Sequence, residues 1–223
     1  MKGIIFDFNG TLFFDSDLHY KAWKVYSKKL RGEEFTDDEM RKHMFGRTNE
    51  DIIEYALGIK PDKELLLKYA KEKEEMYRQM CISDKKRLVL APGAVNFLNY
   101  LKDNKIPRTI ATMSEWDNVE FYFKEFHLSN WFDLDNIVYS DGKIPGKPAP
   151  DIYIIAADRI NLKPEDCIVV EDSISGINAA NAAETGMIIA VASTENIDTL
   201  KQMSYINQII YSFDEIDKNI FTC

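Results

Sequence analysis

Cysteine and histidine are scarce in this sequence, and their spacing excludes two common kinds of site. The 223 residues include three cysteines, Cys81, Cys167 and Cys223, and no Cys-x-x-Cys pair. An odd number of scattered cysteines fits neither a disulfide framework nor a zinc site, so we interpret them as reduced thiols. The three histidines lack the i, i+4 spacing of a helical metal site. Histidine-based metal chemistry is therefore not expected.

Long apolar runs and blocks of like charge are also missing. No run reaches the roughly 18 apolar residues of a membrane span, and Asp7 interrupts the apolar start before a signal-peptide core can form. The 28 Lys+Arg and 37 Asp+Glu give a formal net charge of −9, which argues against nucleic acid as a partner. We therefore expect a soluble, cytoplasmic protein with neither a membrane nor a nucleic-acid partner, and we favour a monomer.

The composition that remains is that of a globular protein. Hydrophobic residues make up 45% of the chain and aromatic residues 12%, while the 29% of charged residues are mixed in sign. This balance excludes a disordered chain or a coiled coil. The length suits one large domain or two small ones.

Short apolar runs recur along the chain and alternate with segments of helical length. Residues 2–8 have the composition of a strand and end at the turn signal Asn9-Gly10-Thr11. Similar runs occupy residues 108–112, 136–139, 167–170, 187–192 and 208–211. Such strands, separated by helices, predict a parallel sheet covered on both faces. The expected fold class is α/β, with a doubly wound Rossmann-like sheet.

Residues 15–85 interrupt this alternation. They contain helical patterns with apolar stripes at residues 22–30, 52–57 and 66–80, and no convincing strand. We therefore expect two domains, an α/β domain of residues 1–14 and 86–223 and an inserted α-helical domain of residues 15–85.

Polar side chains follow the predicted strands, where an α/β sheet binds its ligands. Asp7 follows the first strand, and Thr112 and Ser114 follow the second. Gly146-Lys147-Pro148 comes after the third, and Glu171-Asp172 ends the fourth. Together these positions supply carboxylates, hydroxyls and one ammonium group to one edge of the sheet.

This set of side chains indicates a metal-assisted phosphoryl site. Three carboxylates at one point repel one another unless a cation lies among them, and Mg²⁺ is the hard divalent ion that suits them. Mg²⁺, a lysine and hydroxyls neutralise a phosphoryl group, which a carboxylate nucleophile can then approach. Asp7 is the candidate nucleophile.

The order of these motifs resembles the haloacid dehalogenase-like (HAD) superfamily of phosphatases and phosphotransferases over essentially the whole chain. The segments 6–12, 91–93, 146–151 and 170–177, with Asp15-Ser16 and His19-x-x-Ala22-Trp23, are similar to its β-phosphoglucomutase-like subfamily. That subfamily carries a helical cap after the first motif. The resemblance therefore implies that residues 15–85 are a cap that excludes water and selects the substrate.

The resemblance also implies roles for single residues. Asp7 would form an aspartyl-phosphate, while Thr112 and Lys147 would hold the transferring phosphoryl group. Asp7, Asn9, Glu171 and Asp172 would surround Mg²⁺: Asp172 would bind it directly, Glu171 would orient its ligands or waters, and Asn9 would offer its backbone carbonyl.

Four further residues are implied as substrate contacts. Ser114 lies where family members contact the substrate or its phosphate, although a helix cap is an alternative role. Gly46 and Arg47 lie in a segment similar to the substrate-facing loop of the cap, so Arg47 is a candidate anion contact or else a surface arginine. His19 lies at the implied cap hinge.

Position 9 departs from the family pattern. The usual residue is an aspartate that protonates the leaving oxygen and later activates water, whereas this chain has Asn9. An amide neither gains nor loses a proton at useful pH, so acid-base assistance of roughly 10²–10⁴-fold should be missing. We therefore expect a slow Mg²⁺-dependent phosphatase that acts on a small phosphorylated metabolite.

Several alternatives stay open. His19 would supply the missing proton, because an imidazole titrates near neutral pH. The chain would cleave a different bond, for which Lys42 is a loose candidate Schiff-base residue, or would bind phosphate ligands without catalysis. Deamidation of the Asn9-Gly10 step would create the missing aspartate. A mutase is less favoured, since Asn49 stands about where its phosphate-binding arginine is expected.

Overall fold

The computed structural model describes residues 2–44, 47–193, 195 and 197–221. The chain divides into two compact units: Met1–Phe14 with Val89–Cys223, called the core unit here, and Asp15–Leu88, called the helical unit. The division falls after residue 88, whereas the sequence placed it after 85. The reason is local, because Leu88 N–H donates to Asp84 O and Arg87 pairs with Asp17 of the helical unit at 2.7 Å.

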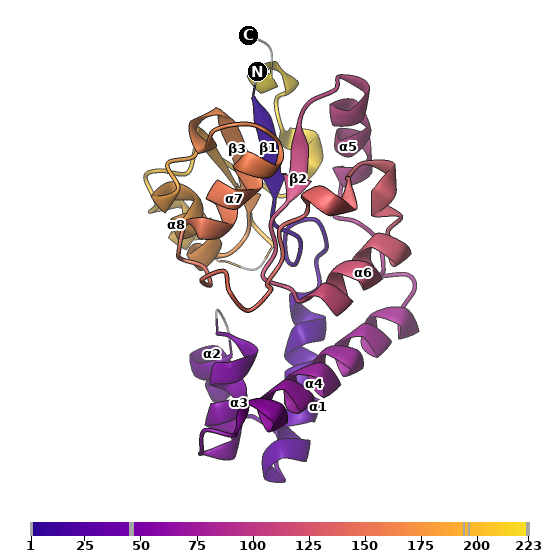
Figure 1. The fold of residues 1–223 in the computed structure, drawn as a ribbon, viewed down its shortest axis with the longest axis vertical. Helices are drawn as coiled ribbons and strands as arrows, with labels where there is room; N and C mark the ends of the chain where they lie inside the picture. Colours follow the sequence, from indigo (N-terminus) through magenta and orange to yellow (C-terminus); the bar gives the residue numbers. More distant parts are fainter. Residues whose placement is uncertain (1, 45–46, 194, 196, 222–223) are drawn as a thin grey trace. The chain divides into compact units, whose positions relative to one another are not determined.

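The core unit is built on a parallel sheet with the strand order β2-β1-β3-β4-β5. Its strands are β1 (Gly3–Phe6), β2 (Arg108–Ile110), β3 (Cys167–Glu171), β4 (Met187–Val191) and β5 (Gln208–Ile210). Figure 1 shows α7 (Asp151–Arg159) and α8 (Ile174–Ala182) on one face of this sheet, and α5 (Ala94–Asp103) and α6 (Trp116–Glu125) on the other. The doubly wound α/β prediction is confirmed.

The predicted strand at residues 136–139 is wrong as a full strand. Only one bridge forms there, between Val138 and Ala111, with Thr112 N–H donating to Val138 O at 2.9 Å. Residues Leu134–Asn136 form a 3-10 turn instead. The segment therefore extends the edge of the sheet beyond β2 by a single contact.

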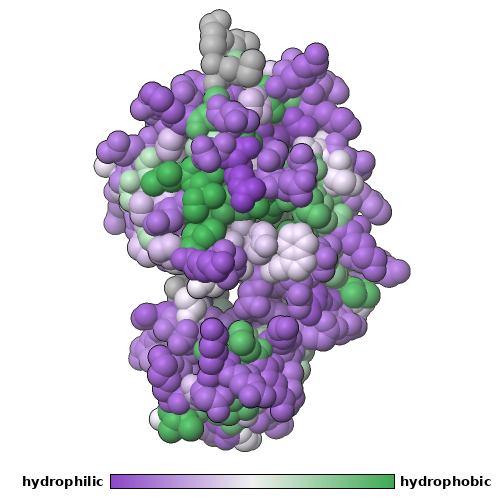
Figure 2. Space-filling view, viewed as in Figure 1, coloured by the Kyte–Doolittle hydropathy of each residue, from purple (hydrophilic) through white to green (hydrophobic). Residues whose placement is uncertain are grey.

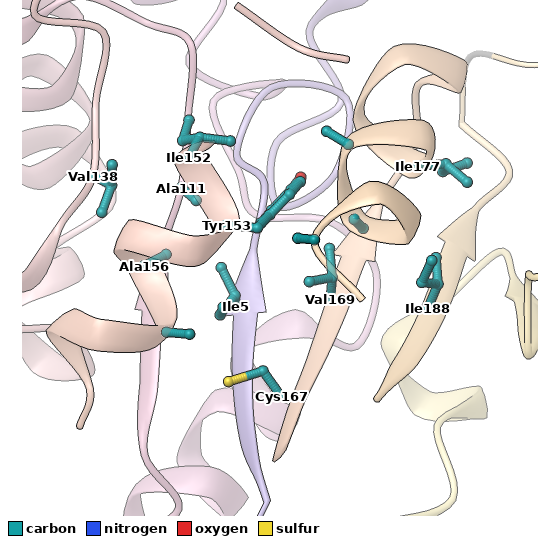
Figure 3. Close-up of a cluster of buried hydrophobic side chains, with 14 of the residues drawn as sticks. Ile5, Ala111, Val138, Ile152, Tyr153, Ala156, Cys167, Val169, Ile177 and Ile188 are labelled. Carbon is teal, nitrogen blue, oxygen red and sulfur yellow. The ribbon is translucent and has the colours of Figure 1, made fainter. Parts of the chain in front are cut away.

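The apolar core of this unit lies between the sheet and the helices α7 and α8. Ile5, Val169 and Ile188 from three adjacent strands are at most 3% exposed. Small residues such as Ala156 and Ala180 face them, which lets the helices approach closely. Figure 3 shows this cluster, with the ring of Tyr153 inside it and its hydroxyl beyond the tip of β1.

The helical unit contains α1 (Ser16–Arg31), α2 (Asp37–His43), α3 (Asn49–Leu57) and α4 (Lys63–Ser83). The three predicted stripes fall on α1, α3 and α4. No predicted stripe covers α2, which begins at a capping box formed by Thr36 and Glu39. Trp23, Tyr26 and Ile53 are among the buried residues of the unit's own apolar core.

Short helical segments complete the core unit. They are η1 (Leu128–Asn130), η2 (Leu134–Asn136), η3 (Pro164–Asp166), α9 (Ile197–Lys201), η4 (Phe213–Glu215) and η5 (Lys218–Phe221). The helix α8 is capped by Ser173, whose side chain accepts from Gly176 N–H at 3.0 Å. The helix α5 begins at Ala94, after Gly93 with φ of 76°.

Cysteine chemistry and surface character agree with the composition. Cys81 and Cys167 are free and buried, and burial raises the pKa of each thiol to about 12, while Cys223 lies outside the described residues. Figure 2 shows hydrophilic side chains over most of the viewed surface. Among the described residues, no helix combines the length and the apolar character needed to cross a membrane.

Candidate active site

The candidate site is organised by β1, which lies between β2 and β3. The chain leaves β1 toward β2 on one side and returns through β3 on the other, and ligands bind at such a reversal of strand order. Asp7 directly follows β1, and its N–H donates to Val170 O at 3.0 Å. The carboxylate is thereby fixed at the carboxyl ends of the central strands, where it is 7% exposed.

A tight loop follows Asp7 and packs against Asp172. Gly10 N–H donates to Phe13 O at 2.7 Å, and Gly10 has a φ of 76°. A Cβ atom at Gly10 would lie 2.2 Å from Asp172 Oδ2, so both the backbone and the space require glycine. Thr11 Oγ1 donates to Asp172 Oδ1 at 2.9 Å, which fixes that carboxylate beside the loop.

Lys147 lies between two carboxylates. Its Nζ is 2.6 Å from Asp7 Oδ1 and 2.6 Å from Glu171 Oε1, and its side chain is only 7% exposed. Burial lowers the pKa of Lys147, but the negative charges of Asp7 and Glu171 outweigh that effect and raise the pKa well above its ordinary value. The site therefore holds a permanent cation beside the candidate nucleophile.

Glu171 is held from both sides. Its Oε1 accepts from the Tyr153 hydroxyl at 3.0 Å, and its Oε2 accepts from the N–H groups of Asp172 and Ser173 at 2.8 Å. Burial and the Glu171 charge raise the pKa of Tyr153 well above its ordinary value, so the phenol stays a donor. A Cβ atom at Gly176 would lie 1.7 Å from Glu171 Oε1, which leaves room only for glycine.

Asp7, Glu171 and Asp172 form a group with metal-binding potential. Each offers a carboxylate oxygen, and these oxygens lie within 4.8 Å of one another in a buried position. A donor set made only of oxygen suits Mg²⁺. Asp7 and Asp172 would hold the ion, because both oxygens of Glu171 already accept hydrogen bonds from the protein.

Thr112, Ser114 and Asn9 lie together beside Asp7. Thr112 follows β2 and is 2% exposed, and its Oγ1 accepts from Ser114 N–H at 3.1 Å. Ser114 Oγ donates to Asn9 Oδ1 at 2.7 Å, and Asn9 Nδ2 donates to the Tyr122 hydroxyl at 2.8 Å. The Tyr122 ring stacks on Phe8 at 4.3 Å. Both ends of the Asn9 amide are therefore fixed by the core unit.

This arrangement opposes deamidation at Asn9. The reaction needs Gly10 N to attack the Asn9 amide carbon, yet Gly10 N–H is bonded to Phe13 O. Ser114 and Tyr122 also hold the amide in one orientation. We therefore expect position 9 to stay an asparagine, and an intact-mass measurement on aged protein tests this.

The remaining predicted residues belong to the helical unit. Arg47 is exposed, and Gly46 lies outside the described residues. His19 Nδ1 is 3.0 Å from Lys73 Nζ, and its ring stacks on Tyr77 at 3.8 Å. Their roles in substrate binding stay predictions.

Two other positions from the sequence alternatives have local partners in this unit. The exposed Lys42 pairs with Asp38 at 2.7 Å, which is an ordinary surface ion pair between residues four apart. Asn49 Nδ2 donates to Glu74 Oε1 at 3.0 Å.

Four residues outside the predicted set of site residues contact this site. Thr11 and Tyr153 bind Asp172 and Glu171, Tyr122 binds Asn9, and Ser193 donates to Gly10 O. Ser193 follows β4, so the rule that ligands bind at strand ends would have found it. Tyr122 and Tyr153 lie on helices, where no motif in the sequence marks which side chain reaches the sheet edge.

Similarity to known proteins agrees with this geometry. The model of the haloacid dehalogenase-like hydrolases matches residues 1–184. The chain belongs to this family of hydrolases. Within the family it belongs to the β-phosphoglucomutase-like group: it is 30% identical to the β-phosphoglucomutase of Bacillus subtilis, over 82% of this chain and 80% of that protein.

Two further relatives align over most of their length. The phosphorylated carbohydrates phosphatase of Thermotoga maritima is 29% identical, over 88% of each chain. The crystal structure of a HAD hydrolase of family IA, variant 3, from Entamoeba histolytica is 41% identical, with a TM-score of 0.92, over 98% of this chain and 96% of that one. The fold and the family are thereby established.

Proposed function

We propose that this protein is a slow Mg²⁺-dependent phosphatase of a small phosphorylated metabolite, with Asp7 as its nucleophile. The observation that carries the proposal is the position of Lys147 Nζ, 2.6 Å from both Asp7 and Glu171 and beside a third buried carboxylate, Asp172. The similarity to named phosphatases of phosphorylated small molecules supports it.

The first step transfers the phosphoryl group to the protein. An Asp7 carboxylate oxygen forms a bond to phosphorus, while the bond from phosphorus to the leaving oxygen breaks. The Lys147 ammonium beside Asp7 and the Thr112 hydroxyl after β2 would bind the phosphoryl oxygens and offset their charge. Mg²⁺ held by Asp7 and Asp172 would supply further positive charge to these oxygens.

For a substrate whose leaving group departs without a proton, the second step, hydrolysis of the aspartyl-phosphate, is the step that Asn9 slows most. Water must lose a proton as it attacks phosphorus, and an amide cannot accept that proton. Ser114 and Tyr122 hold the amide in place, so a reorientation of Asn9 provides no substitute. Substrates with good leaving groups should complete the first step, and the aspartyl-phosphate should then accumulate because its hydrolysis is slow.

A mutase is supported less well. Moving a phosphoryl group between two oxygens of one sugar requires acid-base exchange at position 9 and a firm contact to a second phosphate. Asn49, where an arginine is expected in a mutase, is instead bonded to Glu74. A pure phosphate-binding module would not need the Asp7 carboxylate, because a negative charge repels phosphate.

Hydrolysis of p-nitrophenyl phosphate with Mg²⁺ tests the proposal in three proteins. The natural protein should be slow, Asn9→Asp should be about 10- to 100-fold faster, and Asp7→Asn should be inactive. Asn130→Asp, an exposed change in the same unit, serves as the charge-matched control and should match the natural protein. Equal rates in the natural and Asp7→Asn proteins would remove Asp7 as the nucleophile.

A further inference from the structure

Two aromatic side chains lie on segments that adjoin Ser114 of the candidate site. Trp116, the first residue of α6, is 36% exposed although it is a large apolar side chain. Its ring lies 5.1 Å from the ring of the half-buried Tyr139, at an interplanar angle of 52°. The two rings come from separate segments of the core unit, and we call them the aromatic pair.

Backbone contacts join the aromatic pair to the catalytic residues. Ser140 N–H donates to Ser114 O at 3.0 Å, which connects the segment of Tyr139 to that of Trp116. Ser114 in turn donates to Asn9 at 2.7 Å. The aromatic pair is therefore anchored next to the position that faces the leaving oxygen in the proposed reaction.

Chain geometry limits how far the indole lies from this position. Trp116 is two residues after Ser114, and two residues span at most about 7 Å between Cα atoms. A phosphoryl group held by Asp7, Thr112 and Lys147 would direct its leaving group past Asn9 and Ser114. In the proposed reaction, the portion of the substrate beyond the leaving oxygen would then pass the segment that carries the aromatic pair.

The segment that carries Trp116 is acidic. Residues 113–118 contain Glu115 and Asp117 and no lysine or arginine. A second anionic group would meet carboxylates there, whereas a neutral flat group would meet the indole. Because the two rings are set at 52° to each other, one ring would offer a face on which a flat group stacks. The other ring would contact the edge of that group.

We propose that the aromatic pair binds a planar heteroaromatic ring in the leaving group, so that the preferred substrates are monophosphates of the nucleotide type. The proposal rests on the proposed function for the position of the phosphoryl group. Trp116 would supply the stacking face, and Tyr139 would hold the indole in its orientation. Base stacking on an aromatic side chain changes affinity by about tenfold, which makes the effect measurable.

Inhibition of p-nitrophenyl phosphate hydrolysis tests this inference with three probes. Uridine 5′-monophosphate carries a planar base, glucose 6-phosphate carries a sugar ring, and glycerol 3-phosphate carries neither. The inhibition constant of each is measured on the natural protein, Trp116→Ala and Trp116→Phe. Trp131→Ala is the matched control, because Trp131 lies in the same unit but donates to Asn99 of α5.

Uridine 5′-monophosphate should bind about tenfold more weakly to Trp116→Ala, and Trp116→Phe should recover most of the loss. Glycerol 3-phosphate should bind the natural protein, Trp116→Ala and Trp131→Ala equally. An equal loss for all three probes would mean that Trp116 only supports the fold, and a loss confined to glucose 6-phosphate would assign the indole to a sugar. Either result would overturn the proposal.

Fluorescence separates a failure of this inference from a failure of the proposed function. If the natural protein hydrolyses no phosphate ester, quenching of tryptophan fluorescence by uridine 5′-monophosphate is measured instead. Quenching in the natural protein that is lost in Trp116→Phe supports the stacking site even though the phosphatase proposal has failed. Equal quenching in the two proteins, or none in either, overturns the stacking site.

Discussion

Each unit buries a lysine, and the two lysines have different surroundings. Lys147 of the core unit lies 2.6 Å from two carboxylates, with a third, Asp172, in the same cluster. Lys73 of the helical unit is 1% exposed, with one carboxylate, Glu74, in an ion pair at 2.8 Å. The core unit thus gathers more negative charge around its lysine than the ammonium neutralises.

This difference separates a reactive site from a stabilising contact. Excess buried negative charge is costly unless a further cation joins it, so the Lys147 cluster is suited to receive Mg²⁺ and then a phosphoryl group. Lys73 and Glu74 neutralise each other, and the Lys73 Nζ also lies 5.0 Å from the ring of Trp23. The first cluster serves chemistry in our proposal, and the second serves packing.

Replacing Lys147 should have the largest effect. Lys147→Met removes the ammonium beside Asp7, and turnover of p-nitrophenyl phosphate should fall about 10²- to 10³-fold, as for other losses of a transition-state donor. Lys143→Met removes an exposed lysine four positions earlier in the sequence and should leave the rate unchanged. Similar initial rates for Lys147→Met and Lys143→Met would show that Lys147, like Lys73, takes no part in catalysis.

The same substitution in the helical unit should affect stability. Lys73→Met leaves the buried Glu74 carboxylate without the ammonium that neutralises it, so the free energy of unfolding should fall by about 3 kcal/mol. Urea denaturation checks this, with Lys71→Met, an exposed change on the same helix, as the control. Adding Glu74→Gln should recover part of the loss, and no difference between Lys73→Met and Lys71→Met would disprove the buried pair.

Mg²⁺ should act on the core unit alone. At about 100 times its dissociation constant, the ion should raise the free energy of unfolding of this unit by about 2.7 kcal/mol. Asp172→Asn should remove the gain, while the exposed Asp103→Asn should keep it. Thermal unfolding with and without Mg²⁺ measures this, and an equal gain in Asp172→Asn would contradict the assignment of the metal ligands.

Acid should remove a smaller contribution to the stability of the helical unit, the one made by Glu39. Arg31 and the backbone N–H of Thr36 hold the pKa of Glu39 well below its usual range. Because the pKa is lower in the folded state, the stabilisation is complete above the ordinary glutamate pKa of about 4.3 and is lost as the pH falls below it. Denaturation at pH 7 and in acid should show a larger loss in the natural protein than in Glu39→Gln. The exposed Glu34→Gln should behave like the natural protein.

The contrast between the core unit and the helical unit also explains which contacts the sequence could predict. Asp7, Thr112 and Asp172 follow strands, and parallel strands end at one edge of the sheet, so their convergence follows from topology. The strand predicted at 136–139 shrank to one bridge because the chain turns immediately before it. Lys147 was predicted as a site residue from the place of Gly146-Lys147-Pro148 in the order of the motifs along the chain.

The partners of side chains on helices were harder to predict from the sequence than the residues that follow strands. The contact of Lys73 with His19 joins α4 to α1, and a shift of one residue rotates a helical side chain by about 100°, so periodicity leaves such partners open. Tyr122 and Tyr153 were missed for the same reason. Their hydroxyls reach Asn9 and Glu171 from helices whose packing onto the sheet decides the contact.

Trapping the aspartyl-phosphate tests the central claim most directly. The natural protein is mixed with p-nitrophenyl phosphate and Mg²⁺, quenched in acid and analysed by intact mass and peptide mapping. A slow second step at Asn9 predicts that one phosphoryl group accumulates on the peptide that contains Asp7, that less accumulates in Asn9→Asp, and that none forms in Asp7→Asn. Hydrolysis without any phosphorylated protein, or a phosphoryl group on another residue, would contradict the account.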